Sequence, residues 1–260
     1  MRGKEMAVTL EGKTALITGS GTTGGMGRSH AVLMSERGAD VIVHDINQDG
    51  ANETAELVRA NGQKATVIIA DVRDVPDFTA KIKEAEAEHS KIDILVNNAG
   101  VTGNKLAMED VDEAIFDQMF GVQVRGAFFA TQAVLPGMKA RNHGSIIMIS
   151  SIYAMGGSDF ASHYAAAKAA LSGFTKAWAR EFAAHKIRIN AVAPGFVLTG
   201  MTQGSNTPEM IAERGAGMPL GRLTTPEDIS YAVAWLASEE TEMISGQVIS
   251  PNSGEVIVGY

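Results

Sequence analysis

The chain has 260 residues, of which 45% are hydrophobic and 20% charged, with a net charge of −8 and no cysteine. This composition is typical of a globular α/β protein, and it excludes disulfides and thiolate metal sites. No basic cluster offsets the acidic balance, which argues against nucleic acid or an anionic membrane as a partner, and no apolar run approaches the length of a membrane span. We therefore expect a cytoplasmic protein, and the histidines have no metal-site spacing.

Apolar segments typical of buried strands alternate along the chain with helical segments. We expect strands at 13–18, 41–45, 65–70, 92–96, 146–149, 187–192 and 247–250. We expect helices at 28–37, 48–60, 76–89, about 113–139 with a bend near Gly126 or Pro136, from about Tyr164, and at 226–237. This alternation indicates a parallel sheet with helices on both faces. No linker or repeat divides the chain, so we predict one domain over 1–260, with a lid of loop and helix at about 195–222.

A glycine-rich turn joins the first strand to the first helix and contains Gly19, Gly25, Met26 and Gly27. Glycines let a backbone approach a pyrophosphate closely, and a helix N-terminus offers free N–H donors, although such a turn can also be a flexible connection. Asp45 ends the second strand, where a carboxylate can accept hydrogen bonds from ribose hydroxyls and repel a 2′-phosphate. We therefore predict NAD rather than NADP as the cofactor; the alternative is that Asp45 only caps a turn.

The end of the fifth strand and the helix after it carry the candidate catalytic residues. Ser151 follows the strand, and Tyr164 and Lys168 lie one helical turn apart on the same face. A nearby cation favours the phenolate, so Lys168 is expected to lower the pKa of Tyr164 and make it a usable acid or base. Ser151 could hold the same substrate oxygen by a hydrogen bond. Taken alone, the pair is more often a chance helical pattern.

Several polar and glycine positions fall at or just after strand ends, and in a parallel sheet these ends border one ligand-binding crevice. They are Gly19, Asp45, Asp71, Asn98, Ser151 and Pro194. Asp71 could face the adenine, or be a solvated loop acid. This convergence carries more weight than any single motif.

Taken together, these residues resemble the short-chain dehydrogenase/reductases over nearly the whole chain. The motifs that carry the resemblance are the turn 18–27, Asp71-Val72, Asn97-Asn98-Ala99-Gly100, Ser151, Tyr164-xxx-Lys168 and Pro194-Gly195. The resemblance implies a Rossmann-like, doubly wound, seven-stranded sheet and hydride transfer with a nicotinamide cofactor. It implies that Tyr164 transfers the proton, Lys168 binds the nicotinamide ribose and Ser151 orients the substrate. It also implies adenosine-side contacts for Val72 and Asn98, carboxamide-side positions for Val197 and Thr199, and a homo-oligomer, a tetramer rather than a dimer, packed through the long helices.

Two departures from the family pattern stand out. Gly25 and Gly27 lie two residues further from Gly19 than in the usual TGxxxGxG turn, which leaves the phosphate contacts of 20–24 open. Gln123 stands where the family usually has an asparagine that helps to hold a water in a proton relay from the lysine. We expect the longer amide to preserve activity.

The sequence specifies the substrate poorly. Candidate apolar liners of the pocket are Ile152, Tyr153, Met155, Phe196, Met201, Met210 and Met218, and no pair of arginines indicates a phosphorylated substrate. The favoured function is an NAD-dependent interconversion of a secondary alcohol and a ketone. The alternatives are a reductase of 3-oxoacyl thioesters and, in another class, a non-catalytic NAD-sensing protein.

Overall fold

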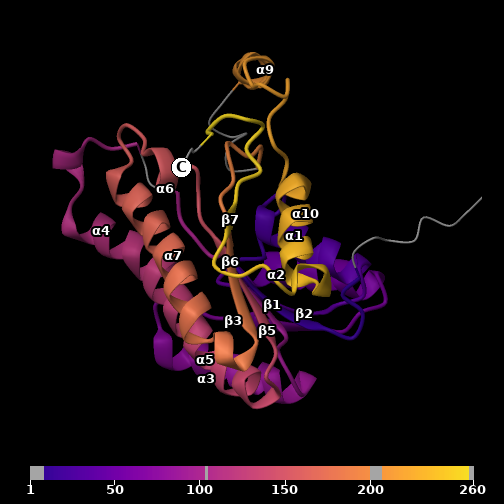
Figure 1. Ribbon diagram of the computed structural model, residues 1–260. Coiled ribbons are helices and arrows are strands. Elements are labelled where there is room, and N and C mark those ends of the chain that lie inside the picture. The colour runs from indigo at the N-terminus through magenta and orange to yellow at the C-terminus, as the bar shows by residue number, and fades with distance from the viewer. Residues whose placement is uncertain (1–8, 103–104, 200–206, 258–260) are drawn as a thin grey trace, which may run out of the picture.

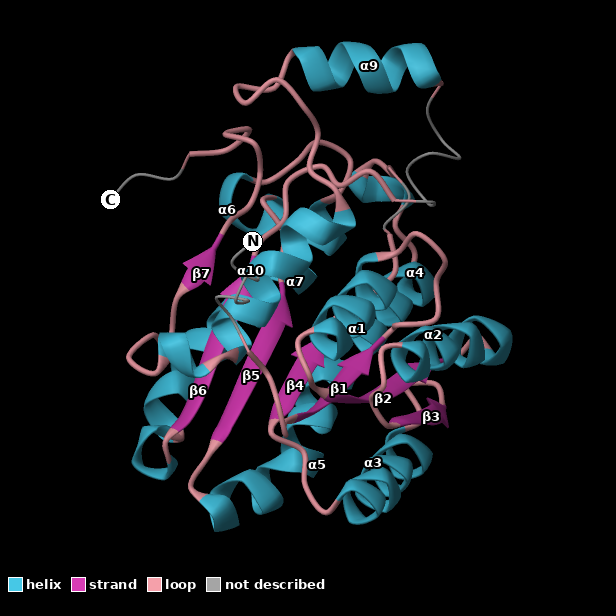
Figure 2. Cartoon of the chain, turned by 90° about the vertical axis from the view of Figure 1, so that its right-hand side faces the viewer, coloured by secondary structure: helices cyan, strands magenta, loops and turns pink. Residues whose placement is uncertain are grey.

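A seven-stranded sheet lies at the centre of the computed structural model, which describes residues 9–102, 105–199 and 207–257 (Figure 2). All strand pairs are parallel, and the strand order is β3-β2-β1-β4-β5-β6-β7. The strands are β1 (Thr14–Thr18), β2 (Asp40–Asp45), β3 (Ala65–Ile69), β4 (Ile94–Asn97), β5 (Gly144–Ile149), β6 (Ile187–Val192) and β7 (Val248–Ile249). The predicted fold class, a Rossmann-like doubly wound sheet of seven strands, is confirmed.

Helices connect the strands and cover both faces of the sheet. They are α1 (Met26–Glu36), α2 (Gln48–Ala60), α3 (Val75–His89), α4 (Glu113–Phe120), α5 (Gly126–Arg141), α6 (Tyr153–Gly156), α7 (Ser162–Glu181), α9 (Pro208–Ala216) and α10 (Pro226–Ala237). Three 3-10 turns are short: η1 (Met108–Asp110), η3 (Ala183–His185) and η4 (Glu239–Thr241). None of the helices within the described ranges is long and apolar enough to span a bilayer.

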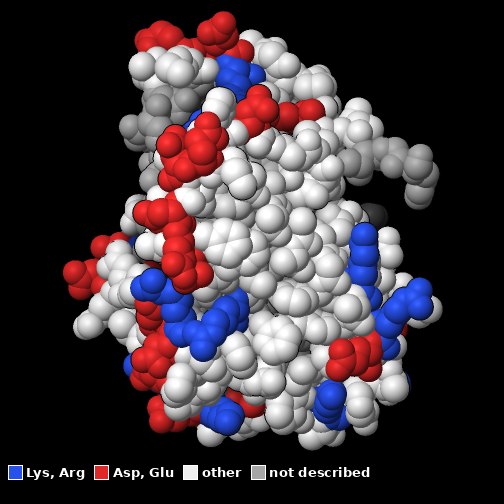
Figure 3. Space-filling view, turned by 90° about the vertical axis from the view of Figure 1, so that its left-hand side faces the viewer, with Lys and Arg blue, Asp and Glu red and all other residues white. Residues whose placement is uncertain are grey.

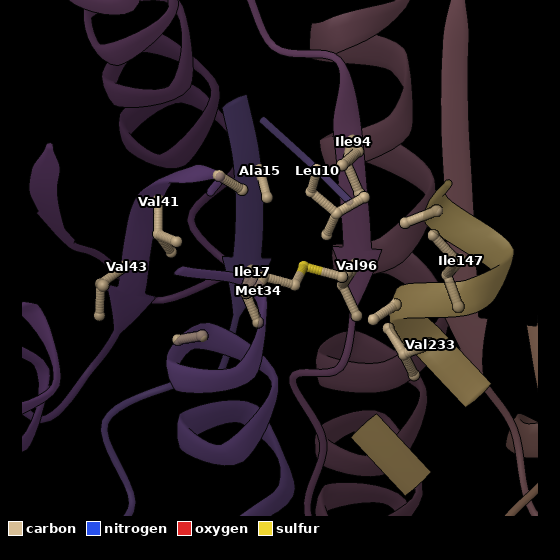
Figure 4. Packing of buried hydrophobic residues seen from close by; sticks show 14 of the residues in the cluster. Leu10, Ala15, Ile17, Met34, Val41, Val43, Ile94, Val96, Ile147 and Val233 are labelled. Atoms are coloured by element: carbon tan, nitrogen blue, oxygen red, sulfur yellow. The ribbon is translucent and has the colours of Figure 1, made fainter. Parts of the chain in front are cut away.

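The core consists of two apolar layers because alternate residues of each strand point to opposite faces. Ala15 and Ile17 of β1 pack with Met34 of α1 and Val233 of α10, on the face that α2 also covers (Figure 4). Leu16, between them in sequence, packs on the other face, against residues of α3, α5 and α7. Figure 1 shows α1, α2 and α10 on one side of the sheet and α3, α5 and α7 on the other. Burial on both faces explains why apolar residues predominate in the central strands.

The helix expected at about 113–139 runs from Glu113 to Arg141, with a wide turn in its middle. This turn, η2 (Gly121–Arg125), has π-helical hydrogen bonding and leads directly into Gly126, near which a bend was predicted. A π turn inserts one extra residue, and such turns are common at functional sites. Gln123, the residue that departs from the family pattern, lies in this turn and is buried.

The strand order reverses direction between β1 and β4, since β2 and β3 lie to one side and β5 to β7 to the other. Ligands of open α/β sheets bind outside the carboxyl ends of the strands at such a point. The chain between 195 and 222, predicted to be a lid of loop and helix, carries α9, which lies beyond these ends and apart from the two helical layers (Figure 2).

Candidate active site

A cavity of about 630 Å³ opens at the carboxyl ends of the strands. All the predicted cofactor contacts border it: Gly19, Gly25, Met26, Gly27, Asp45, Asp71, Val72, Asn98, Tyr164, Lys168, Val197 and Thr199. Ser151 borders it as well, whereas Gln123 is buried behind its wall. The fold therefore brings together residues that are spread over some 180 positions of the sequence.

The glycine-rich turn approaches its neighbours too closely for side chains. A Cβ on Gly19, whose φ is +67°, would lie 2.8 Å from the Cα atom of Ala99, and a Cβ on Gly27 would overlap the carbonyl oxygen of Gly19. Asn98 secures the turn by donating hydrogen bonds from Nδ2 to the carbonyls of Thr18 and Gly19, both at 2.9 Å. This arrangement brings the start of α1 to the cavity with its backbone N–H groups open.

The start of α1 differs from those of the neighbouring helices in its capping. Asn47 caps α2 and Asp74 caps α3 with a side-chain oxygen, but no side chain caps α1 at Gly25. Met26 and Gly27, the first two residues of α1, line the cavity. Uncapped N–H groups and the positive end of the helix dipole make this a place where a phosphate group can bind.

The extra length of the turn is folded back onto the start of α2. The backbone N–H of Gly21 donates to Oδ2 of Asp45 at 2.7 Å, and that of Asn47 donates to Oδ1 at 2.9 Å. Arg28 donates from Nη2 to the carbonyls of Gly21 and Gly50, both at 3.0 Å. Asp45 thus holds the turn, as the alternative interpretation supposed, while each of its oxygens retains a lone pair for a ligand.

His44 is a residue of this site that the sequence analysis considered only as a metal ligand. Its Nδ1 atom accepts a hydrogen bond from the N–H of Gly19 at 3.4 Å, and its Nε2 atom lies 3.1 Å from the carbonyl oxygen of Ala70. Burial lowers its pKa to about 4, so it is neutral near pH 7 and donates through Nε2. Its place beside Asp45 at the end of β2 was the only available signal.

Asp71 and Val72 lie at the same end of the cavity, after β3. The carboxylate of Asp71 forms an ion pair of 2.6 Å with Arg73, and the hydrogen bond from that guanidinium lowers the pKa of Asp71. Val72 is buried against Gly126, where a Cβ would lie 2.9 Å from that of Val72. The carboxylate of Asp71, which was predicted to face the adenine, therefore already has a cationic partner.

Ser151, Tyr164 and Lys168 meet at the opposite end. The hydroxyl of Ser151 lies close enough to the phenol of Tyr164 to lower its pKa, and it accepts a hydrogen bond from the N–H of Tyr153 at 3.2 Å. Nζ of Lys168 donates to the carbonyl of Ile149 at 2.8 Å and lies 5.6 Å from the centre of the Tyr164 ring. The three side chains are thus positioned by the end of β5 and the first turns of α7.

Burial controls the ionisation of this group. It raises the pKa of Tyr164 to about 12, against a smaller lowering by the Ser151 hydrogen bond, and it lowers the pKa of Lys168 to about 7. The expectation that Lys168 lowers the pKa of the phenol is wrong for the protein itself, because the loss of solvation disfavours both charged forms.

Gln123 lies beside this group without lining the cavity. Its Nε2 atom donates to the carbonyl of Val101 at 3.1 Å and to the sulfur of Met119, while its buried Oε1 atom has no hydrogen-bond partner among the described residues. A Cβ on Gly100 would lie 3.5 Å from this Oε1 and 3.6 Å from Nζ of Lys168. The unpaired amide oxygen and the lysine therefore border the same small space.

The chain after β6 forms the remaining wall. Val197 pairs with Thr224 in an isolated parallel bridge, and Thr199 follows. Of the predicted apolar liners, Ile152, Tyr153 and Phe196 border the cavity, Met155, Met210 and Met218 do not, and Met201 lies outside the described residues. Arg214 of α9, which the sequence analysis did not single out, borders it too.

Comparison with known proteins supports an enzymatic site. The family model described as enoyl-(acyl carrier protein) reductase matches residues 19–255. A 3-oxoacyl-[acyl-carrier-protein] reductase of Thermotoga maritima is 36% identical over 249 residues, 95% of this chain and 99% of the relative. One of Escherichia coli is 37% identical over 251 residues, 96% of this chain and 100% of the relative.

Solved structures give the same likeness in three dimensions. A 7α-hydroxysteroid dehydrogenase complexed with NADH and 7-oxo glycochenodeoxycholic acid has a TM-score of 0.89 and 33% identity, with 95% of this chain and 96% of that chain covered. A carveol dehydrogenase of Mycobacterium avium in complex with NAD has a TM-score of 0.88 and 28% identity, with 95% and 98% covered.

Proposed function

The chain belongs to the short-chain dehydrogenase/reductases, a family of nicotinamide-dependent oxidoreductases, and we propose that it interconverts a secondary alcohol and a ketone with NAD. The observation that carries the proposal is the convergence of Ser151, Tyr164 and Lys168 on the cavity that Gly19 and Asp45 also border. A cavity with an uncapped helix start at one end and an acid–base group at the other is suited to a dinucleotide beside a small substrate.

The residues at the first end of the cavity fit a nicotinamide dinucleotide. The uncapped start of α1 would bind the pyrophosphate, and the glycines that tolerate no Cβ would let the backbone approach it. The free lone pairs of Asp45 would accept the adenosine ribose hydroxyls. A 2′-phosphate would meet the negative charge of Asp45, and this supports NAD over NADP.

The residues at the other end would carry the acid–base chemistry. The bound nicotinamide supplies the hydride in the reduction and accepts it in the oxidation. Tyr164 would give its phenolic proton to the carbonyl oxygen in the reduction and take it back in the oxidation. Ser151, whose hydroxyl lies beside the phenol, would hold the same oxygen. Lys168, with a pKa near 7, would supply the cation that stabilises the phenolate as it forms.

Gln123 would complete the path of the proton from Lys168. A water beside Gly100 could accept a hydrogen bond from Nζ of Lys168 and donate one to the unpaired Oε1 of Gln123. The longer side chain would thereby replace the asparagine that the family usually has.

Gln123→Asn should leave kcat within about tenfold of the wild type, whereas Gln123→Leu should lower it by about tenfold to a hundredfold, because leucine offers no acceptor to a relay water. Steady-state turnover of the three proteins at one pH makes the comparison. An inert wild type with an active Gln123→Asn variant would contradict a working relay through glutamine.

A second function, the reduction of 3-oxoacyl thioesters, is favoured by the relatives that bear the name of that activity. The two functions share the chemistry of Tyr164 and differ only in what the substrate carries beyond the reacting carbon.

The test is a panel of secondary alcohols, polyols, sugars and hydroxyacyl thioesters, each offered with NAD and with NADP while absorbance at the reduced nicotinamide band is followed. We expect turnover of at least one class, with NAD preferred by at least about tenfold because Asp45 repels the 2′-phosphate. Preference for the thioesters would select the second function. Preference for NADP would contradict the role given to Asp45.

We also propose a homo-oligomer that packs through the long helices. A hollow of about 780 Å³ on the face of α4, α5 and α7 is lined by Phe128, Phe129 and Phe174 among others, and Phe116 nearby is 46% exposed. Figure 3 shows this face, on which an area without charged side chains runs through the middle. Arg73, Asp117 and Arg125 also line this hollow. Exposed apolar patches bordered by polar residues mark interaction surfaces, and a second copy of the chain would cover this one.

A further inference from the structure

The charged side chains that line the cavity give its two ends opposite net charges, because at the acidic end two carboxylates face one cation, Arg73, which is paired with Asp71. Asp45 and Asp71, which follow β2 and β3, are the acidic residues among the described lining. Lys105 and Arg214 lie at the other end together with the catalytic Lys168, and no acidic residue lines the described wall there. The segments 103–104 and 200–206 contain no charged residue in the sequence. The acidic end suits ribose hydroxyls, so the basic end lies on the substrate side and calls for an explanation of its own.

Arg214 is held in one orientation by two neighbours. Its Nη2 atom donates to Oε1 of Glu255 at 3.1 Å, and its guanidinium stacks on Phe196 with Cζ 3.8 Å from the ring centre. Glu255 is itself fixed, because its Oε2 accepts the N–H of Phe196 at 3.0 Å. The described residues provide no acceptor for the Nε and Nη1 atoms of Arg214. An arginine that is stacked and paired on one side presents its remaining donors with little loss of side-chain entropy.

Lys105 supplies a second cation on the same side. The N–H of Leu106 donates to the carbonyl of Phe160 at 2.9 Å, which ties the segment that carries Lys105 to the loop before α7. Because Tyr164 stands in the first turn of α7, Lys105 lies on the catalytic side of the cavity. Apart from Lys168, which serves the phenol, Lys105 and Arg214 against the single carboxylate of Glu255 leave one positive charge, which matches a monoanion better than a phosphate dianion.

We propose that the substrate of this site carries a carboxylate, which Arg214 binds with Lys105 as a second cation. This inference rests on the proposed function, since it names the substrate class of the same site. The carboxylate would accept hydrogen bonds from the free donors of Arg214, while the reacting carbon lies at Tyr164. Phe196 and Ile152 would contact the apolar chain between them.

The first experiment compares keto acids of graded chain length with their methyl esters, which are neutral and of similar shape. With wild-type protein and NADH, the acid of the best length should have a kcat/KM at least about tenfold above that of its ester, the effect of one hydrogen bond to a charged group. Acid binding to the NADH complex is followed separately by the change in NADH fluorescence.

Three variants distinguish a role of Arg214 in substrate binding from a purely structural role of its ion pair with Glu255. Arg214→Gln should lower the acid-to-ester ratio of kcat/KM by about tenfold, mainly through KM. Arg222→Gln is the matched control, because Arg222 also pairs with an acid, Asp228, in the same region but does not line the cavity, and it should keep the wild-type ratio. Glu255→Gln removes the competing charge while keeping an oxygen for the N–H of Phe196, so it should raise the ratio.

If the ion pair between Arg214 and Glu255 has only a structural role, Arg214→Gln and Glu255→Gln should lower kcat/KM for acids and esters alike. That result would overturn the inference. Wild-type turnover of esters as fast as acids would also overturn it while leaving the oxidoreductase function in place. Carboxylate binding that depends on Arg214, without turnover of any member of the panel, would instead support the anion site and contradict the proposed function.

Discussion

Replacing Tyr164 by phenylalanine should lower kcat by about a thousandfold, within the range that general acid–base groups contribute, and leave NADH binding nearly unchanged. The phenol of Tyr164 lies beside the hydroxyl of Ser151 at the catalytic end of the cavity, where the reacting oxygen of a substrate would lie. Phenylalanine keeps the ring and its packing against Tyr153, whose ring centre is 6.0 Å away, so the wall of the cavity should keep its shape.

The measurement pairs initial rates with a fluorescence titration of NADH. Tyr231→Phe is the matched control, because Tyr231 is 52% exposed on α10 and does not line the cavity. If Tyr164→Phe turns over within tenfold of the wild type, another group transfers the proton. If the Tyr164→Phe variant shows no turnover and still fulfils the cellular role of the wild type, the result supports the NAD-sensing alternative.

The pKa values explain why the proton transfer needs Tyr164 and Lys168 together. Burial raises the pKa of Tyr164 to about 12 and lowers that of Lys168 to about 7, so the uncharged pair is favoured over a wide pH range. Formation of a phenolate beside Lys168 would raise the affinity of that amine for a proton, since opposite charges stabilise each other at low dielectric. The two residues should therefore titrate as a coupled pair, and a pH profile of kcat would report the pair.

The sequence predicts this fold well because the strands are buried on both faces. Such strands are apolar throughout, and three elements, α2, β6 and α10, have the bounds expected from pattern and capping residues alone. The π turn Gly121–Arg125 was not predicted, because its hydrogen bonding leaves no mark in the apolar periodicity. Only a bend at its end, near Gly126, could be inferred.

The candidate site was partly predictable for a similar reason. Residues at the carboxyl ends of parallel strands must share one edge, so their positions in the sequence place them in one crevice. Roles that depend on contacts between distant segments could not be found in this way. His44 holds Gly19, Arg28 holds Gly21, and Arg214 reaches the cavity from α9, a helix whose bounds the predicted lid at 195–222 left open. Burial, which decides the pKa of Tyr164, is equally a property of the folded chain.

Gly27→Ala should abolish tight NADH binding and lower the free energy of unfolding by about 1–3 kcal/mol, the usual cost of overpacking. The added methyl group would overlap the carbonyl oxygen of Gly19 and lie 2.6 Å from Nδ2 of Asn98. Gly19 cannot retreat, because its own Cβ position is already 2.8 Å from the Cα atom of Ala99 and its carbonyl accepts the Asn98 hydrogen bond. The methyl group must therefore displace the start of α1 from the cavity.

Gly217→Ala is the control for this variant, because a Cβ there would meet nothing nearer than 3.5 Å and Gly217 does not line the cavity. Urea unfolding gives the stability of both variants, and NADH titration of the folded protein gives the affinity. Wild-type affinity in a folded Gly27→Ala protein would mean that the start of α1 does not bind the pyrophosphate. Loss of affinity in the folded variant would locate the phosphate contacts at the first turn of α1, since Asp45 and Tyr164 lie outside the overlap that the methyl group creates.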